Sequence, residues 1–321
     1  MHQLSSYPHL NKWYQKRKAS PPPISNGIVE YTNWHFCQAF ANINFEETYF
    51  IWIRTLNKLL SYSVDPQSDY EKIESFFNKS GYPLSQQISN LGHQAFQLQK
   101  DDEFFHLMCQ AAKKIKLDSF HFMAAWTALN RDDYSACIDE CTKILAPSAS
   151  VNTLHGQALL ESGEPENASI VLEEATELDP NEVLAWFQLA KSEWVQSKLE
   201  GAWEALKICH SLVPNNIEVA LFFSIIAIEK RTDSSWLKFA WNVLHPYLLS
   251  FPNNRELIVK LCSLAFTGSE KNWATFVVSN SKWDEVYQAM IADKELGNIL
   301  RSLGELEWFD LANKILLDIN I

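Results

Sequence analysis

Apolar residues recur at spacings of three and four along most of the chain, a pattern typical of amphipathic α-helices. Between Tyr49 and Leu60, the apolar positions 49, 51, 52, 53, 56, 59 and 60 form one helical face. Asn44 precedes this stretch and Glu47 follows three residues later, which predicts the N-terminus of a helix. Asp65 before Pro66 predicts the start of another helix, which Ser80-Gly81 ends.

One arrangement of large and small residues occurs twice in the middle of the chain, over 149–182 and over 183–216. Small residues occupy the eighth, twentieth and twenty-seventh places of both copies: Gly156, Ala168 and Ala175, then Ala190, Ala202 and Cys209. Pro180 and Pro214 lie 34 residues apart and end the copies, because proline cannot continue a helical hydrogen-bond ladder. This period predicts a stack of helix pairs.

The two copies resemble tetratricopeptide repeats, helix pairs that bury their apolar faces by stacking on neighbouring pairs. The resemblance is specific over 149–216, weaker over 84–254 and absent from the first 80 residues. It implies an all-α fold: a right-handed α-solenoid of helix-turn-helix repeats with a divergent helical cap at each end. The expected parts are a flexible basic and proline-rich tail (1–27), an N-terminal cap (28–83), the repeat array (84–254) and divergent C-terminal helices (255–321).

The charge distribution limits the classes of partner. The chain has 39 acidic and 27 basic residues and a net charge of −12, which argues against nucleic acid as a main ligand. Residues 1–27 contain four basic residues and no acid, so this tail is either a flexible leader or a basic docking arm. The longest apolar stretches, such as 219–228, are far short of the roughly 20 residues that a membrane span needs. The first residues lack the pattern of a secretory signal.

The six cysteines are expected to be structural thiols. Cys137, Cys209 and Cys262 fall at places twenty, twenty-seven and eight of their repeats, where a small buried residue is required. Cys137 and Cys141 could form half a metal site, but no Cys-x-x-Cys pair or histidine cluster completes one. Free thiols favour the reducing cytoplasm. No phosphate loop, dinucleotide motif or nucleophile elbow occurs, so we expect neither a cofactor nor catalysis.

The resemblance also implies where a partner would bind. In this family the first helix of each repeat lines a concave groove through its second, fifth, sixth, ninth, twelfth and thirteenth residues. The partner-binding residues expected on this basis are Phe122, Trp126, Leu154, Phe187, Lys191, Trp194, Phe222 and Ile225. The carboxylate-clamp members of the family need several lysines, arginines and asparagines at these places, whereas here only Lys191 is cationic. An amphipathic helix or an extended apolar peptide fits such a groove better.

These observations predict a non-enzymatic, cytoplasmic adaptor that holds an apolar segment of another protein in its groove. A chaperone or assembly factor that shields a client segment is the alternative. The groove could also be filled by the chain's own C-terminal helix, at about 306–319. Self-association through Trp273, Trp283 or Trp308 remains a further possibility.

Overall fold

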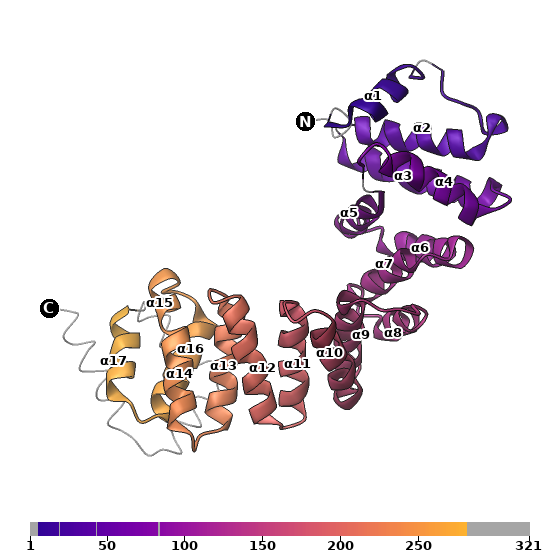
Figure 1. Ribbon diagram of the computed structural model, residues 1–321. Coiled ribbons are helices and arrows are strands. Elements are labelled where there is room, and N and C mark those ends of the chain that lie inside the picture. The colour runs from indigo at the N-terminus through magenta and orange to yellow at the C-terminus, as the bar shows by residue number, and fades with distance from the viewer. Residues whose placement is uncertain (1–5, 19, 43, 83, 281–321) are drawn as a thin grey trace. The chain divides into compact units, whose positions relative to one another are not determined.

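The structure, a computed structural model, describes residues 6–18, 20–42, 44–82 and 84–280 (Figure 1). Within these ranges every regular element is a helix, which confirms the predicted all-α fold. The chain divides into two compact units, residues 1–178 and residues 179–321.

The first unit is a series of helices that pack against their neighbours in the chain. Its elements are α1 (Pro8–Gln15), the 3₁₀ turn η2 (Ile24–Asn26), α2 (Ile28–Ala41), α3 (Phe45–Tyr62), α4 (Pro66–Asn78), α5 (Leu84–Gln97), α6 (Asp101–Ile115), α7 (Asp118–Leu129), α8 (Tyr134–Thr142), α9 (Ala149–Glu161) and α10 (Pro165–Leu178). One buried apolar cluster extends from Leu10 to Ala124, and a second joins residues of α7, α8 and α9.

Local sequence signals explain where these helices begin. The side chain of Asn44 accepts a hydrogen bond from the backbone N–H of Glu47 at 3.0 Å, and that of Asp65 accepts one from Ser68 at 3.1 Å. Both N-caps predicted from the sequence are therefore confirmed. Such a cap satisfies one of the backbone donors that have no partner within the helix.

The structure differs from the sequence-based expectation near the N-terminus. Residues 8–15, which we expected to be part of a flexible tail, form α1, and Leu10 and Tyr14 on this helix are buried. The Trp13 ring packs edge-on against Phe76 of α4 at 5.0 Å between centroids. The spacing of residues 10, 13 and 14 is that of a short apolar helix face, and this face docks on the α2–α4 core.

The hairpin of α9 and α10 shows why the repeat needs small residues. A Cβ atom added at Gly156 would lie 2.7 Å from Leu172 Cδ2, a distance at which the two helices could no longer pack this closely. Ala168 and Ala175 are fully buried on the facing helix. Gly163 joins the two helices with a φ of 87°, a left-handed conformation that glycine adopts without strain.

The second unit repeats the same hairpin. Its helices are α11 (Val183–Val195), α12 (Leu199–Leu212), α13 (Ile217–Glu229), α14 (Ser234–Leu244), α15 (Pro246–Ser250), α16 (Arg255–Thr267) and α17 (Lys271–Asn280). Ala202, Leu206 and Cys209 of α12 are buried between α11 and α13, and Trp203 stacks on Trp236 of α14 at 4.3 Å. The first helices of the hairpins, α11 and α13, begin at the first residue of the repeats read from the sequence.

Candidate functional site

Three aromatic side chains that the sequence assigns to the groove are in contact in the second unit. The ring of Phe222 on α13 lies 5.8 Å from that of Phe187 and 5.6 Å from that of Trp194, both on α11. Both pairs are edge-to-face, with interplanar angles of 70° and 88°. This geometry suits the electrostatics of aromatic rings and fixes the side chains relative to each other.

Two further residues predicted for the groove lie on the same helices. The Lys191 Nζ is 5.1 Å from the centroid of the Phe187 ring, a cation–π contact. Ile225 follows Phe222 by one helical turn on α13. Phe222 is buried, whereas Phe187, Lys191, Trp194 and Ile225 are half-buried and keep part of their surface open to solvent. We call these five residues the α11–α13 face.

Glu229 of α13 is a further residue of this region, which was not predicted from the sequence. Its carboxylate accepts a hydrogen bond from the Trp194 indole N–H at 2.8 Å and so joins α13 to α11. Glu229 occupies the thirteenth place of its repeat, so the same repeat register could have identified it. Gln188 of α11 is also notable, because it is buried and its Oε1 has no hydrogen-bond partner among the described residues.

In the first unit the predicted groove residues have mixed surroundings. Phe122 and Trp126 of α7 are half-buried and pack against the core clusters, and the Trp126 ring meets His93 of α5 edge-on at 4.7 Å. Leu154 of α9 is 7% exposed and lies within the core cluster of α7, α8 and α9. A partner could reach Leu154 only if this core opened. The helix expected at 306–319 lies outside the described residues.

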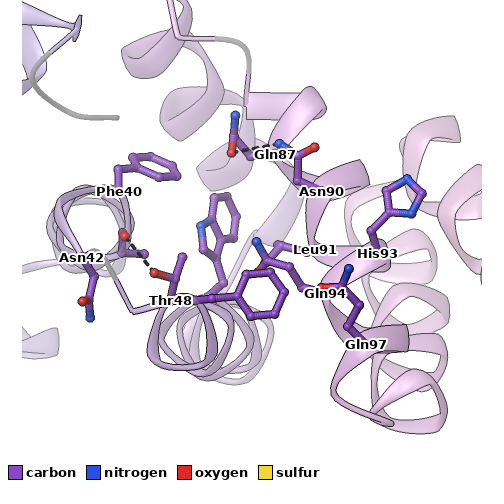
Figure 2. Close-up of a pocket in the computed structure, with 12 residues that line it drawn as sticks. Phe40, Asn42, Thr48, Gln87, Asn90, Leu91, His93, Gln94 and Gln97 are labelled. Carbon is purple, nitrogen blue, oxygen red and sulfur yellow. Dashed lines mark hydrogen bonds between the residues drawn. The ribbon is translucent and has the colours of Figure 1, made fainter. Parts of the chain in front are cut away.

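A pocket of about 510 Å³ lies between α2, α3 and α5 of the first unit. Figure 2 shows Phe40, Asn42 and Thr48 on one side and Gln87, Asn90 and Gln94 of α5 on the other. Sequence spacing does not reveal this pocket, because its residues come from three helices outside the specific repeats.

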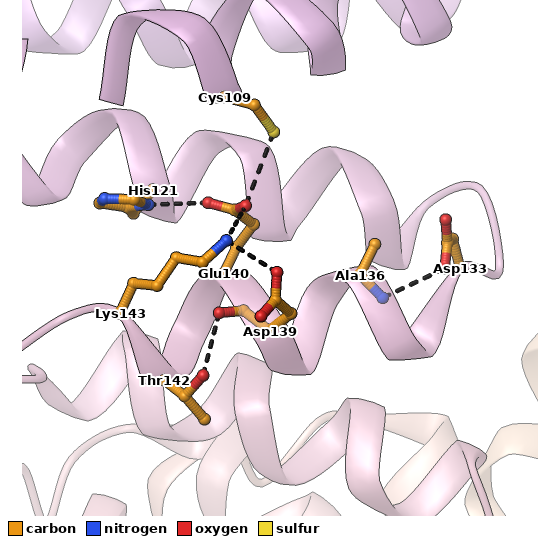
Figure 3. A network of polar contacts seen from close by, with 8 residues as sticks. All are labelled: Cys109, His121, Asp133, Ala136, Asp139, Glu140, Thr142 and Lys143. Carbon is orange, nitrogen blue, oxygen red and sulfur yellow. Dashed lines mark hydrogen bonds and ion pairs between the residues drawn. The ribbon is translucent and has the colours of Figure 1, made fainter. Parts of the chain in front are cut away.

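A group of polar side chains in the first unit surrounds Glu140 of α8 (Figure 3). Its carboxylate is 6% exposed and lies 2.6 Å from Lys143 Nζ, 2.7 Å from His121 Nδ1 and 3.7 Å from Cys109 Sγ. Burial alone would raise the pKa of Glu140, but the hydrogen bonds with Lys143 and His121, together with the charge attraction to these two residues, outweigh burial and lower it. The carboxylate therefore acts as a charged cross-link between α6, α7 and α8.

All six cysteines are free thiols, and five of them are buried. Burial raises the pKa of Cys37 and of Cys262 to about 12, so neither is a thiolate near neutral pH. The described residues contain no group of three or more side chains that could hold a metal ion. None of the described helices is long and apolar enough to cross a membrane.

Several known proteins are similar to this chain. TTC0263, a tetratricopeptide repeat protein of Thermus thermophilus, is 17% identical, with 56% of this chain and 98% of that chain covered and a TM-score of 0.43. MamA from Desulfovibrio magneticus RS-1 is 17% identical, with 50% and 94% covered and a TM-score of 0.43. A chain of the Cut9–Hcn1 hetero-tetramer of the APC/C is 14% identical, with 87% and 57% covered and a TM-score of 0.47. A comparison with curated protein sequences finds no match.

A family model matches one part of the sequence. The profile of the tetratricopeptide repeat matches residues 151–192, which include most of the α9–α10 hairpin and the first part of α11. The helix boundaries and the small residues of that hairpin agree with this match. Residues 151–192 thus contain a tetratricopeptide repeat.

Proposed function

We propose that the chain is a non-enzymatic scaffold that binds an apolar helix or peptide segment of another protein on the α11–α13 face. The observation that carries the proposal is the contact of Phe222 with both Phe187 and Trp194. These contacts hold two half-exposed aromatic side chains in fixed orientations. Binding loses less side-chain entropy when its anchors are already ordered in the free protein.

The energetics of such a face favour an apolar segment. Each aromatic or aliphatic anchor that a partner covers contributes about 1.5–3 kcal/mol, and aromatic residues are enriched among the residues that dominate binding. Leu184 and Val195 are 46% and 52% exposed at the two ends of α11, so the apolar surface continues along this helix. Lys191 supplies one positive charge, and Glu229 one negative charge, at the face.

The proposal extends to the protein's role in a complex and to its compartment. An adaptor role means that the chain stays bound in the mature complex, whereas a chaperone would be released from it. The six free thiols suit a reducing compartment such as the cytoplasm.

Site-specific photo-crosslinking tests where the partner binds. We would incorporate p-benzoylphenylalanine at Leu184 or at Val195, and at Ile208 of α12 as a control that is 37% exposed. Positions 184 and 195 should crosslink one and the same protein, through an apolar segment, and position 208 should not. Equal labelling from position 208, or crosslinks to a charged segment, would contradict the proposal.

A further inference from the structure

The pocket between α2, α3 and α5 has the size and the lining of a binding site. Its volume of about 510 Å³ falls within the range of about 300–1,000 Å³ that ligand pockets occupy. All of its lining residues belong to the first unit, so it is separate from the α11–α13 face.

The pocket has an aromatic floor. Phe40 of α2, Trp52 of α3 and Leu91 of α5 line it and are each 3% exposed, so the surrounding core holds them in place. Phe45 also lines the pocket but is 42% exposed. A single apolar side chain could therefore insert between a rigid floor and an accessible ring.

Amide side chains supply most of the polar lining. They are Asn42, Gln87, Asn90, Gln94 and Gln97. A side-chain amide carries an N–H donor and a carbonyl acceptor on one planar group, and a peptide unit carries the same pair. An asparagine or glutamine can therefore bond both polar groups of a peptide backbone.

Charge excludes several other ligands. The described lining contains no lysine, arginine, aspartate or glutamate, and its one titratable side chain is His93, whose ring packs edge-on against Trp126. Moving a phosphate, a carboxylate or an ammonium group from water into this pocket would cost free energy, because no lysine, arginine, aspartate or glutamate of the lining would compensate its charge. The ligand that fits this lining is uncharged.

One side-chain oxygen of the lining has no hydrogen-bond partner among the described residues. Gln94 Oε1 is shielded from solvent and accepts no hydrogen bond from the described residues. The neighbouring amides differ, since Asn90 Nδ2 donates to Gln87 Oε1 at 3.4 Å and Asn42 Oδ1 accepts from the Asn44 backbone at 3.1 Å. A buried acceptor without a donor carries a desolvation cost, which a ligand N–H would relieve when the half-buried Gln94 side chain turns toward the pocket.

From these observations we infer that this pocket is a second binding site, which takes an uncharged, extended peptide segment. The side-chain amides of α5 form hydrogen bonds with the backbone of the segment, and one of its apolar side chains packs on Phe40 and Trp52. This inference goes beyond the proposed function, because it assigns a different ligand to a different unit.

Selection from a phage-displayed library of random heptapeptides tests the inference. The full chain serves as bait, and phage that bind the Gln94→Leu variant equally well are removed. Enriched sequences are then synthesised with capped ends, and their affinities are measured by fluorescence polarisation. They should be uncharged and carry one aromatic or large aliphatic residue.

Three changes should each weaken binding at least about 10-fold: Gln94→Leu, Phe45→Ala, and N-methylation of the central peptide bonds. Phe45 is exposed, so Phe45→Ala keeps the test decisive if Gln94→Leu fails to fold. Trp194→Ala should leave this affinity unchanged.

The inference is overturned if no sequence is enriched, or if any of these three changes leaves the affinity within about two-fold of the original. Loss of binding in Trp194→Ala would also overturn it, because the peptide would then belong to the α11–α13 face. That last outcome would leave the proposed function intact.

Discussion

The indole N–H of Trp194 donates a hydrogen bond of 2.8 Å to the carboxylate of Glu229, which joins the first helices of two successive hairpins. The bond holds the indole of Trp194, the largest aromatic ring of the α11–α13 face, in one orientation. It therefore connects the packing of the repeats directly with the surface that we propose binds a partner.

Removing the acceptor should loosen this ring. Glu229→Leu should move the Trp194 indole N–H resonance in a ¹⁵N–¹H spectrum and broaden it, while stability changes by only about 0.5–1 kcal/mol because the bond is exposed. Glu218→Leu on the same helix is the control and should leave the resonance in place. An unchanged Trp194 resonance in Glu229→Leu would show that the bond does not orient the ring.

The close approach of α9 and α10 can be tested at Gly156. Gly156→Ala should destabilise the protein by about 1–3 kcal/mol, because the new methyl group would press on the fully buried Leu172. Chemical denaturation measures the change. In the double variant with Leu172→Ala, the total loss should be smaller than the sum of the two single losses.

Gly201→Ala provides a matched control for this substitution. There the added Cβ would meet the carboxylate of Glu193, the far end of a side chain that can swing aside. Since alanine favours helix over glycine by about 1 kcal/mol, Gly201→Ala should be neutral or stabilising. Equal losses at Gly156 and Gly201 would contradict the packing explanation.

The Glu140 cluster predicts a pH dependence of stability. The folded-state pKa of Glu140 lies below its ordinary value of 4.5, so the stabilisation is complete above that value. It is lost as the pH falls from 4.5 through the lower folded-state pKa. Glu140→Gln should lower the free energy of unfolding by about 1–3 kcal/mol at pH 7. It should also reduce the pH dependence of stability below pH 4.5.

Thermal unfolding between pH 3 and pH 7 measures this effect. Glu204→Gln is the control, because Glu204 pairs with Lys207 at the surface at 2.9 Å. This exposed pair should contribute no more than about 1 kcal/mol. A pH profile of Glu140→Gln identical to that of the original protein would rule out the cross-link.

Docking of α1 should be worth several kcal/mol. Leu10 is fully buried in the core of the first unit, so Leu10→Ala should cost about 2–5 kcal/mol. His9→Ala, at an exposed neighbour, should have little effect. If hydrogen exchange showed residues 8–15 unprotected in the original protein, α1 would be a flexible tail after all.

The sequence was informative where a structural feature depends on local spacing. The 34-residue period placed the starts of α9, α11 and α13 at residues 149, 183 and 217, and the cap pattern placed those of α3 and α4. The helix α1 was missed because proline-rich sequence follows it and its apolar face is short.

Other features depend on how distant helices meet, which spacing does not encode. The burial of Leu154 depends on the packing of α7 and α8 around it. The amide-lined pocket needs residues of α2, α3 and α5 in one place, and the partner of Trp194 depends on the rotamer of Glu229.

The most direct test of the central claim is the affinity for the crosslinked partner segment, measured by calorimetry for four forms of the full chain. Trp194→Ala and Phe187→Ala should each weaken binding by about 2 kcal/mol or more, roughly 30-fold. Phe251→Ala, which removes a ring that is 50% exposed outside the α11–α13 face, should match the original protein. Unchanged affinity in both Trp194→Ala and Phe187→Ala would show that the partner binds elsewhere.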